Sequence, residues 1–296
     1  MKKPETAVTK KKKKPRSRAG ETWHRLKKNK GAMIGLAIII ILVLIALYTS
    51  IFWDYNTMIV KVNIPERVQP PSRAHPFGTD DMGRDVLIRT LYGTKYSLII
   101  GFGATAIGLI IGVLLGAVAG YFGGFLEDVI MRATDIFASI PAILMGMVIV
   151  CVLGTSLPNL LIAVGITAVP AFTRITRSMV LTIRNQEYIE AAKCIGTPNL
   201  KIIITEVIPN SLSPIIVVAS SRIGSCTIQA AGLSFLGFGV PAPAPEWGAM
   251  ISLSRNYIRT APWMTLFPSL FIIIMVLAFN ILGDGLRDAL DPKLRR

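Results

Sequence analysis

Long uncharged stretches dominate the pattern of this chain. Four blocks contain no charged residue, and a fifth is interrupted only by Arg222. The blocks are residues 32–53, 96–126, 136–173, 207–245 and 261–283. A bilayer core roughly 30 Å thick is crossed by about 20 apolar residues in a helix, so each block is long enough to span a membrane. The pattern predicts an all-α integral membrane protein.

The block 136–173 is long enough for two spans, because Gly154-Thr-Ser-Leu-Pro158 supplies a turn in its middle. The sequence therefore predicts six transmembrane helices. Their expected positions are about 32–53, 97–120, 131–152, 157–175, 211–232 and 263–283.

Basic residues are distributed unevenly along the 296 residues, 52% of which are hydrophobic. Thirteen of the 32 Lys and Arg residues lie in positions 1–30, before the first span. With that tail inside, the inner segments and their flanks hold 23 Lys and Arg residues and the outer ones eight. This asymmetry predicts that both termini are cytoplasmic.

The net charge of +15 does not by itself indicate nucleic-acid binding. The run Lys10–Lys14 with Arg16 and Arg18 has no interleaved aromatic residues, and no nucleic-acid-binding module follows it. We expect the run to lie on anionic lipid headgroups, with a solvated tail as the alternative.

The connector 176–210 has the pattern of a helix–glycine–helix unit. Apolar residues recur at helical spacing before Gly196, which can end a helix in the left-handed conformation. Thr197 and Pro198 are typical of an N-cap and a first helical residue. A second apolar stripe follows, formed by Leu200, Ile203, Ile204, Val207 and Ile208. Periodicity alone leaves open a docking surface for a soluble partner or a hairpin lying on the membrane.

The stretch Tyr188-Ile-Glu-Ala-Ala-Lys-Cys-Ile-Gly196, followed by Ile208-Pro-Asn210, resembles the EAA loop of permease subunits in ATP-binding-cassette (ABC) importers. That resemblance covers the order, the spacing and the placement before the penultimate span.

Three further motifs resemble the C-type permease subunit of dipeptide and oligopeptide importers. They are His75–Val86, Gly232–Gly239 with Pro245-Glu-Trp-Gly248, and Asn280–Pro292. One departure is Gln229-Ala-Ala-Gly232, where the family often has an acidic residue.

The resemblance implies the MetI-like fold of a type I ABC importer. Residues 95–285 would form the permease core, after a basic tail at 1–30 and a first helix with an external segment at 31–94. Residues 286–296 would form a cytoplasmic C-terminal tail. The resemblance also implies a heterodimer with a related permease subunit in the cytoplasmic membrane of a bacterium or archaeon. Two ATPase subunits would bind on the inside and a substrate-binding protein on the outside.

The resemblance assigns eight residues of the connector to the loop that couples the permease to the ATPase. They are Tyr188, Glu190, Ala191, Ala192, Gly196, Thr197, Pro198 and Pro209. We expect ATP and magnesium to be bound by the ATPase partners, because no stretch of this chain matches a P-loop. We therefore expect this chain to be a transporter subunit without a cofactor of its own.

Gly108, Gly112, Gly116 and Gly120 recur every fourth residue of the second predicted span. Small residues at this spacing favour close helix–helix contact, either within this chain or with a partner. A phosphate-binding loop is disfavoured, because no strand precedes the glycines and no GK[ST] follows.

Arg222 lies near the middle of the fifth predicted span, with Ser225, Cys226 and Gln229 on the same helical face. A charge at this depth is costly, so we expect it to face a water-filled path or a partner. One hypothesis is that the face lines the translocation path, where Arg222 could attract a substrate carboxylate. The alternative is a structural pair with an acid of a partner chain.

His75 with Asp80, Asp81 and Asp85 could suggest a metal site. We expect instead that Thr79-Asp80-Asp81 caps a short helix beginning near Met82, and no metal site is predicted. The three cysteines match no disulfide or metal pattern.

Dipeptides or oligopeptides are the substrates that the resemblance implies. Nickel chelates, glutathione or oligosaccharides remain alternatives within the same family. A secondary transporter is a further alternative, which would show inverted repeats and paired charges at mid-membrane. A membrane anchor that recruits a soluble enzyme is another.

Overall fold

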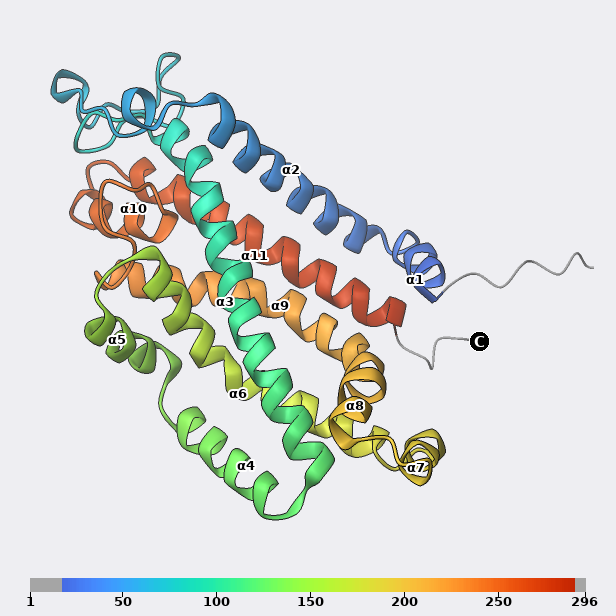
Figure 1. Ribbon diagram of the computed structural model, residues 1–296. Helices are drawn as coiled ribbons and strands as arrows, with labels where there is room; N and C mark the ends of the chain where they lie inside the picture. Colours follow the sequence, from blue (N-terminus) through green and yellow to red (C-terminus); the bar gives the residue numbers. More distant parts are fainter. Residues whose placement is uncertain (1–17, 291–296) are drawn as a thin grey trace, which may run out of the picture.

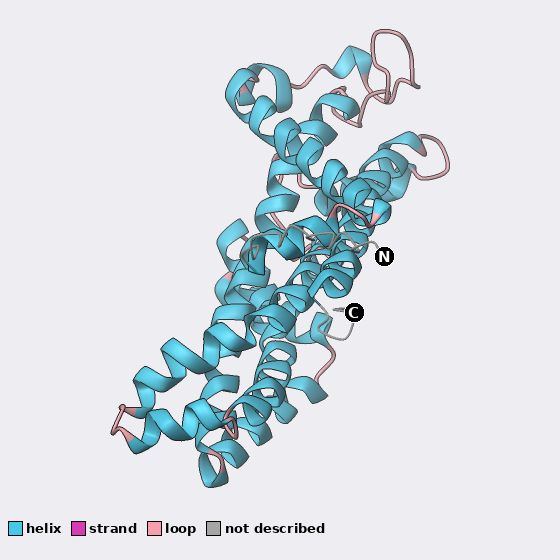
Figure 2. Cartoon of the chain, turned by 90° about the vertical axis from the view of Figure 1, so that its right-hand side faces the viewer, coloured by secondary structure: helices cyan, strands magenta, loops and turns pink. Residues whose placement is uncertain are grey.

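A computed structural model describes residues 18–290, and every regular element in that range is a helix (Figures 1 and 2). Within residues 18–290, five helices are long and apolar enough to cross a membrane. They are α2 (Lys30–Phe52), α3 (Val86–Phe122), α6 (Leu157–Ile183), α9 (Ile208–Phe235) and α11 (Trp263–Leu290). The fold class expected from the sequence is confirmed.

The third predicted span is not one straight helix. It consists of α4 (Gly124–Ser139) and α5 (Ala142–Leu153), which are bent by 92° relative to each other. Pro141 has no N–H group, and its ring pushes Ile140 out of the helical region, to φ −88° and ψ 128°. The prediction of a continuous helix at 131–152 is therefore wrong, and six spans result only if the bent pair counts as one.

Helices α3 and α6 extend furthest beyond their apolar blocks. Helix α3 begins at Val86 rather than near residue 97, and α6 continues to Ile183 rather than ending near 175. The extra turns carry charged residues, among them Arg89 and Arg177. An uncharged block marks only the part of a helix suited to lipid, and a helix can continue past that part where water or protein accepts the charges.

The glycine ladder of α3 packs against α6 of the same chain. A Cβ atom added to Gly108, Gly112, Gly116 or Gly120 would lie 2.5–2.8 Å from the nearest α6 atom. Any side chain at these positions would therefore force the two helices apart. The contact left open by the sequence is thus internal, and it makes α3 and α6 a closely packed pair.

The remaining long helices complete the bundle. Helices α2 and α9 both pack on α11, and α1 (Arg18–Leu26) lies beside the last turn of α11 (Figure 1). Leu26, Ala32 and Ala289 form a small apolar cluster at that junction.

The segments between spans gather at two opposite ends of the bundle (Figure 1). One end, called here the α7 end, holds α1, α7 (Glu187–Cys194), α8 (Asn199–Ile202) and the single-turn π-helix Ile203–Val207. The other holds α10 (Trp247–Ser254) and residues 53–85, with the short helical turns Tyr55–Ile59, Ile64–Glu66 and Arg255–Tyr257. These are the two sets of segments that the basic-residue count places inside and outside.

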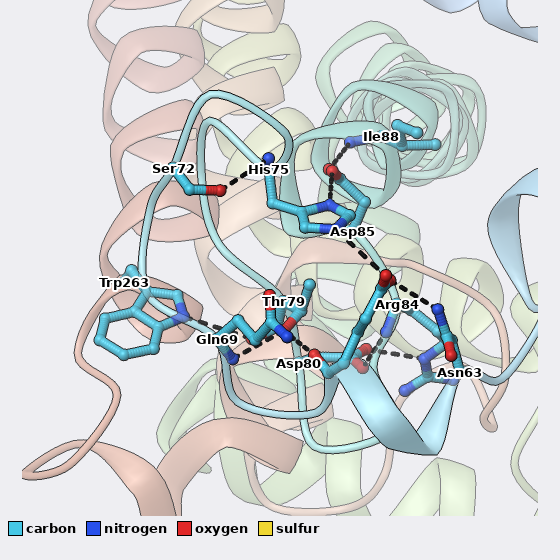
Figure 3. A network of polar contacts seen from close by, with 11 residues as sticks. Asn63, Gln69, Ser72, His75, Thr79, Asp80, Arg84, Asp85, Ile88 and Trp263 are labelled. Carbon is cyan, nitrogen blue, oxygen red and sulfur yellow. Dashed lines mark hydrogen bonds and ion pairs between the residues drawn. The ribbon is translucent and has the colours of Figure 1, made fainter.

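The segment before α3 is folded by a network of polar contacts (Figure 3). Asp80 accepts hydrogen bonds from the Met82 and Arg84 amides and pairs with the Arg84 guanidinium at 2.7 Å. Asp85 accepts from the Ile88 amide and is the N-cap of α3. His75 Nδ1 lies 2.8 Å from Asp85 Oδ2.

The expected cap at Thr79-Asp80-Asp81 is therefore wrong, and no helix begins near Met82. Asp80 is occupied by its own turn and by Arg84, and Asp85 instead accepts from the Ile88 amide at the start of the helix. Arg89 then joins this segment to the opposite loop, because its guanidinium donates to the carbonyl oxygens of Ile59 and Pro243.

Candidate functional site

Helix α7 is held to the bundle by one buried side chain. Ile189 is the only buried residue of α7, and it belongs to an apolar cluster that includes Tyr121 of α3, Val180 of α6 and Val207. The other residues of α7 remain open to solvent or half-buried. The helix is therefore anchored on one side and free on the other.

Gly196 ends α7 as the sequence predicts. Its φ angle of +77° lies in the left-handed region, and the Thr197 amide donates to the Ala192 carbonyl oxygen across it. The expected start of the second helix, with Thr197 as N-cap and Pro198 as first residue, is wrong by one residue. Helix α8 begins at Asn199, Pro198 is the N-cap, and no side chain caps the helix. Thr197 already belongs to the end of α7, so it does not open the next helix.

Large apolar side chains are exposed along α7 and the segment after it. Ile195 is 82% exposed, Leu200 68% and Ile204 57%. Together with the exposed ring of Tyr188 they are called here the docking face. Exposed apolar groups gathered on one short segment indicate a surface that another protein or a membrane covers.

Helical spacing alone does not separate the buried from the exposed apolar residues of this segment. Ile202, Ile203 and Val207 are buried, whereas Leu200 and Ile204 are not. Of the residues assigned by resemblance, Glu190 and Ala191 are exposed beside the docking face, and Ala192 is half-buried. Pro209 lies apart from them in the first turn of α9.

Direct contacts connect this segment to the spans. Tyr121 at the end of α3 donates a hydrogen bond of 2.9 Å to Oδ1 of Asn199. The Arg184 guanidinium donates to the Gly120 carbonyl oxygen at 2.9 Å, and the Lys193 ammonium lies over the Tyr121 ring. These contacts, with the apolar cluster around Ile189, join α7 and α8 to the ends of α3 and α6.

A cavity of about 280 Å³ lies inside the membrane-spanning part, beside the bend between α4 and α5. Arg222 of α9 and Arg174 of α6 both line it. Arg174 pairs with Asp135 at 2.8 Å. The cavity therefore opens where α4, α5, α6 and α9 meet.

The predicted polar face of α9 is only partly assembled at this cavity. Gln229 donates to the Ala142 carbonyl oxygen and to the Thr167 hydroxyl, and both of these residues line the cavity. Ser225 is exposed. Cys226 is buried in the apolar cluster on the other side of α9, because its position on the helix turns it toward α3.

Comparison with known proteins identifies the family. Residues 112–296 match the family described as binding-protein-dependent transport system inner membrane component. Residues 17–71 match the N-terminal TM domain of oligopeptide transport permease C. The chain belongs to this permease family. It is an ABC-importer membrane subunit and not an enzyme, as the resemblance implied.

Similar proteins cover nearly the whole chain. The dipeptide transport permease DppC of Alkalihalophilus pseudofirmus is 47% identical over 93% of this chain and 90% of its own. The oligopeptide permease OppC of Bacillus subtilis is 39% identical over 92% and 88%. The glutathione permease GsiD of Pectobacterium atrosepticum is 40% identical over 93% and 91%.

A solved structure supports the MetI-like fold. The chain is similar to a structure titled as inward-facing MetNI methionine ABC transporter, with a TM-score of 0.56 and 19% identity. The match covers 69% of this chain and 97% of that one. At this identity the likeness concerns the fold alone.

Proposed function

We propose that this permease is half of the membrane path of an ATP-driven peptide importer. It would pair with a related permease subunit, two ATPase subunits inside and a substrate-binding protein outside. The observation that carries the proposal is the docking face on α7 and α8, which exposes Ile195 and Leu200 at the end where the basic segments gather. An apolar face on an anchored helix suits a groove in a soluble partner.

The charge distribution supports an orientation with the α7 end and both termini in the cytoplasm of a bacterial or archaeal cell. In this orientation α10 and residues 53–85 face the substrate-binding protein. ATP and magnesium would be bound entirely by the ATPase subunits.

The mechanism follows from the contacts of α7. ATP binding draws the two ATPase subunits together and moves the docked helices with them. Ile189 and the Tyr121–Asn199 hydrogen bond transmit this movement to the packed pair α3 and α6. The two permease subunits then rock between inward-open and outward-open states. In this mechanism the exposed Glu190 makes polar contacts with the ATPase, while Ala191, Ala192 and Gly196 allow close approach.

Peptides are the substrate class that the similar proteins favour, because relatives of 47% and 39% identity are named as dipeptide and oligopeptide permeases. Glutathione, itself a tripeptide, is the second candidate, supported by a relative of 40% identity. Uptake assays with the purified complex and both solutes distinguish the two.

The proposal is tested by co-expressing the permease with its partner permease and ATPase subunits and purifying the complex in mild detergent. Ile195→Asp should lose the ATPase subunits, because it places a charge in the apolar contact. Ile64→Asp is the matched control, since Ile64 is 54% exposed at the opposite end. ATPase retained at wild-type stoichiometry by Ile195→Asp would contradict the proposed docking.

A further inference from the structure

Arg222 carries a charge that no other residue of the described range 18–290 pairs with. It lies near the middle of α9, inside a candidate membrane span, and its side chain is half-buried. Among residues 18–290, none forms a hydrogen bond or an ion pair with its guanidinium. A charge at this depth requires water or an anion close by.

The surroundings of Arg222 provide space for such an anion. The cavity has a volume of about 280 Å³. The smallest pockets that bind small molecules have volumes of about 300 Å³, so the cavity is close to this size. Nine of its twelve lining residues are apolar, among them Phe137, Met145 and Ile166, and the others are Thr167 and the two arginines. No carboxylate belongs to the lining. An anion that entered would therefore meet the Arg222 guanidinium and no carboxylate of the lining.

The second arginine of the cavity does not have the same role. Arg174 already pairs with Asp135 at 2.8 Å, so its charge is balanced. Gln229, about two turns further along α9, fixes that helix against α5 and α6 through Ala142 and Thr167. Arg222 is thus a positioned cation whose own counter-ion must come from outside the described chain.

We propose that this cavity is a carboxylate-binding subsite of the membrane path, in which Arg222 receives the C-terminal carboxylate of a peptide in transit. The inference rests on the proposed function and adds a recognition residue to it. A guanidinium offers a planar pair of N–H donors that match the two oxygens of a carboxylate. The apolar wall suits the side chain of the last residue of a peptide. Partial exposure of Arg222 keeps the contact weak enough for release.

The first test compares two tripeptides that differ only at the C-terminus, one with a free carboxylate and one with an amide. Each is preloaded on the binding protein and supplied to the reconstituted complex. Arg222→Gln should lower uptake of the carboxylate peptide about tenfold, as expected for a lost charge-assisted contact, and leave uptake of the amide unchanged. Ser213→Ala is the matched control, since Ser213 is an exposed residue of the same helix outside the lining.

Two outcomes of that test overturn the subsite. An equal loss of uptake for both peptides would mean that Arg222 pairs with an acid of the companion permease. An unchanged preference would mean that the arginine does not meet the carboxylate. If the wild-type complex shows no ATP-dependent peptide uptake, the proposed function fails as well, so the two failures are distinguishable.

A second measurement uses the wild-type complex and so does not depend on the variant assembling. A tripeptide ending in p-benzoylphenylalanine is irradiated during turnover with ATP and magnesium. The subsite predicts adducts on residues of the cavity wall, Phe137, Met145 or Ile166. Adducts found only on residues outside this cavity would overturn the proposal.

Discussion

The hydroxyl of Tyr121 donates a hydrogen bond of 2.9 Å to Oδ1 of Asn199. One residue is in the last turn of a membrane-spanning helix, and the other is the first residue of α8, directly after α7. Helix α3 also packs tightly on α6 through its glycine ladder. The bond therefore joins α8 to this closely packed pair of spans.

Removing this bond should weaken the transmission of movement without unfolding the protein. In Tyr121→Phe the contact of about 0.5–1.5 kcal/mol is lost while the ring stays in its cluster. We expect more ATP to be hydrolysed per peptide imported, measured in proteoliposomes. Asn199→Leu should behave alike, whereas Asn199→Asp keeps an acceptor oxygen and should stay close to the wild-type ratio. An unchanged ratio in Tyr121→Phe would contradict this role.

Substitutions of Gly196 should destabilise the end of α7 according to how poorly the new residue adopts a left-handed backbone conformation. Its φ is +77°, and no atom lies within 4 Å of an added Cβ, so the penalty is conformational. Gly196→Ala should cost roughly 1–2 kcal/mol locally, and Gly196→Asn less. Gly196→Asp adds a charge at the dock and should leave the protein in the membrane with uptake uncoupled from ATP hydrolysis. Normal coupling in Gly196→Asp, checked against membrane abundance by immunoblot, would count against the assigned role.

The α3–α6 contact should not accept even one methyl group at Gly112. A Cβ there would lie 2.5 Å from the Phe172 Cβ and 2.9 Å from the Val169 carbonyl oxygen. Gly112→Ala should therefore destabilise the protein by about 1–3 kcal/mol, visible as a lower melting temperature in detergent. Gly103→Ala is the control, because its Cβ would meet only the flexible end of Leu161. Equal melting temperatures for the two variants would refute the close packing.

Glu246 should make stability depend on pH. Its carboxylate is buried at the start of α10 and accepts from the amides of Gly248 and Ala249, and burial raises the pKa of this carboxyl. The ordinary pKa of a glutamate is about 4.3. At a pH above this value, Glu246 keeps its proton in the folded state, whereas in the unfolded chain it loses it. The free energy of unfolding therefore falls as pH rises toward the raised pKa.

The measurement is the melting temperature of wild type relative to Glu246→Gln, which removes the titrating group. As pH rises from about 4 to 8, the melting temperature of wild type should fall relative to that of Glu246→Gln. A difference that is constant or that grows with pH would show that the carboxyl is not held in its neutral form by burial.

The sequence predicted the parts of the fold that depend on local pattern. Uncharged blocks located the spans, and Gly196 was correctly expected to end α7 in the left-handed conformation. The bend before α5 was missed, although the Ile140-Pro141 pair carried the signal, because the apolar run continues across it. The short helix expected near Met82 was wrong, because Asp80 is engaged by its own turn and by Arg84 and helix α3 begins after Asp85.

The site depended more on tertiary contacts. Periodicity grouped Leu200 with Ile203, yet only Ile203 meets the cluster under α7, so exposure of the docking face could not be derived from spacing. The cavity likewise required the bend between α4 and α5. Arg222 was singled out by its charge alone, while the space beside it became visible only in the fold.

Docking of α7 on the ATPase is the central claim, and a native cysteine allows a direct test. Cys194 ends α7 and is exposed, and Cys226 is buried. In a Cys151→Ser background, a photoactivatable maleimide is attached to Cys194 in membranes containing the full complex, and the sample is irradiated. The account predicts an adduct between the permease and an ATPase subunit. Labelling of Cys194 only from the outer side of the membrane, with no ATPase adduct, would contradict it.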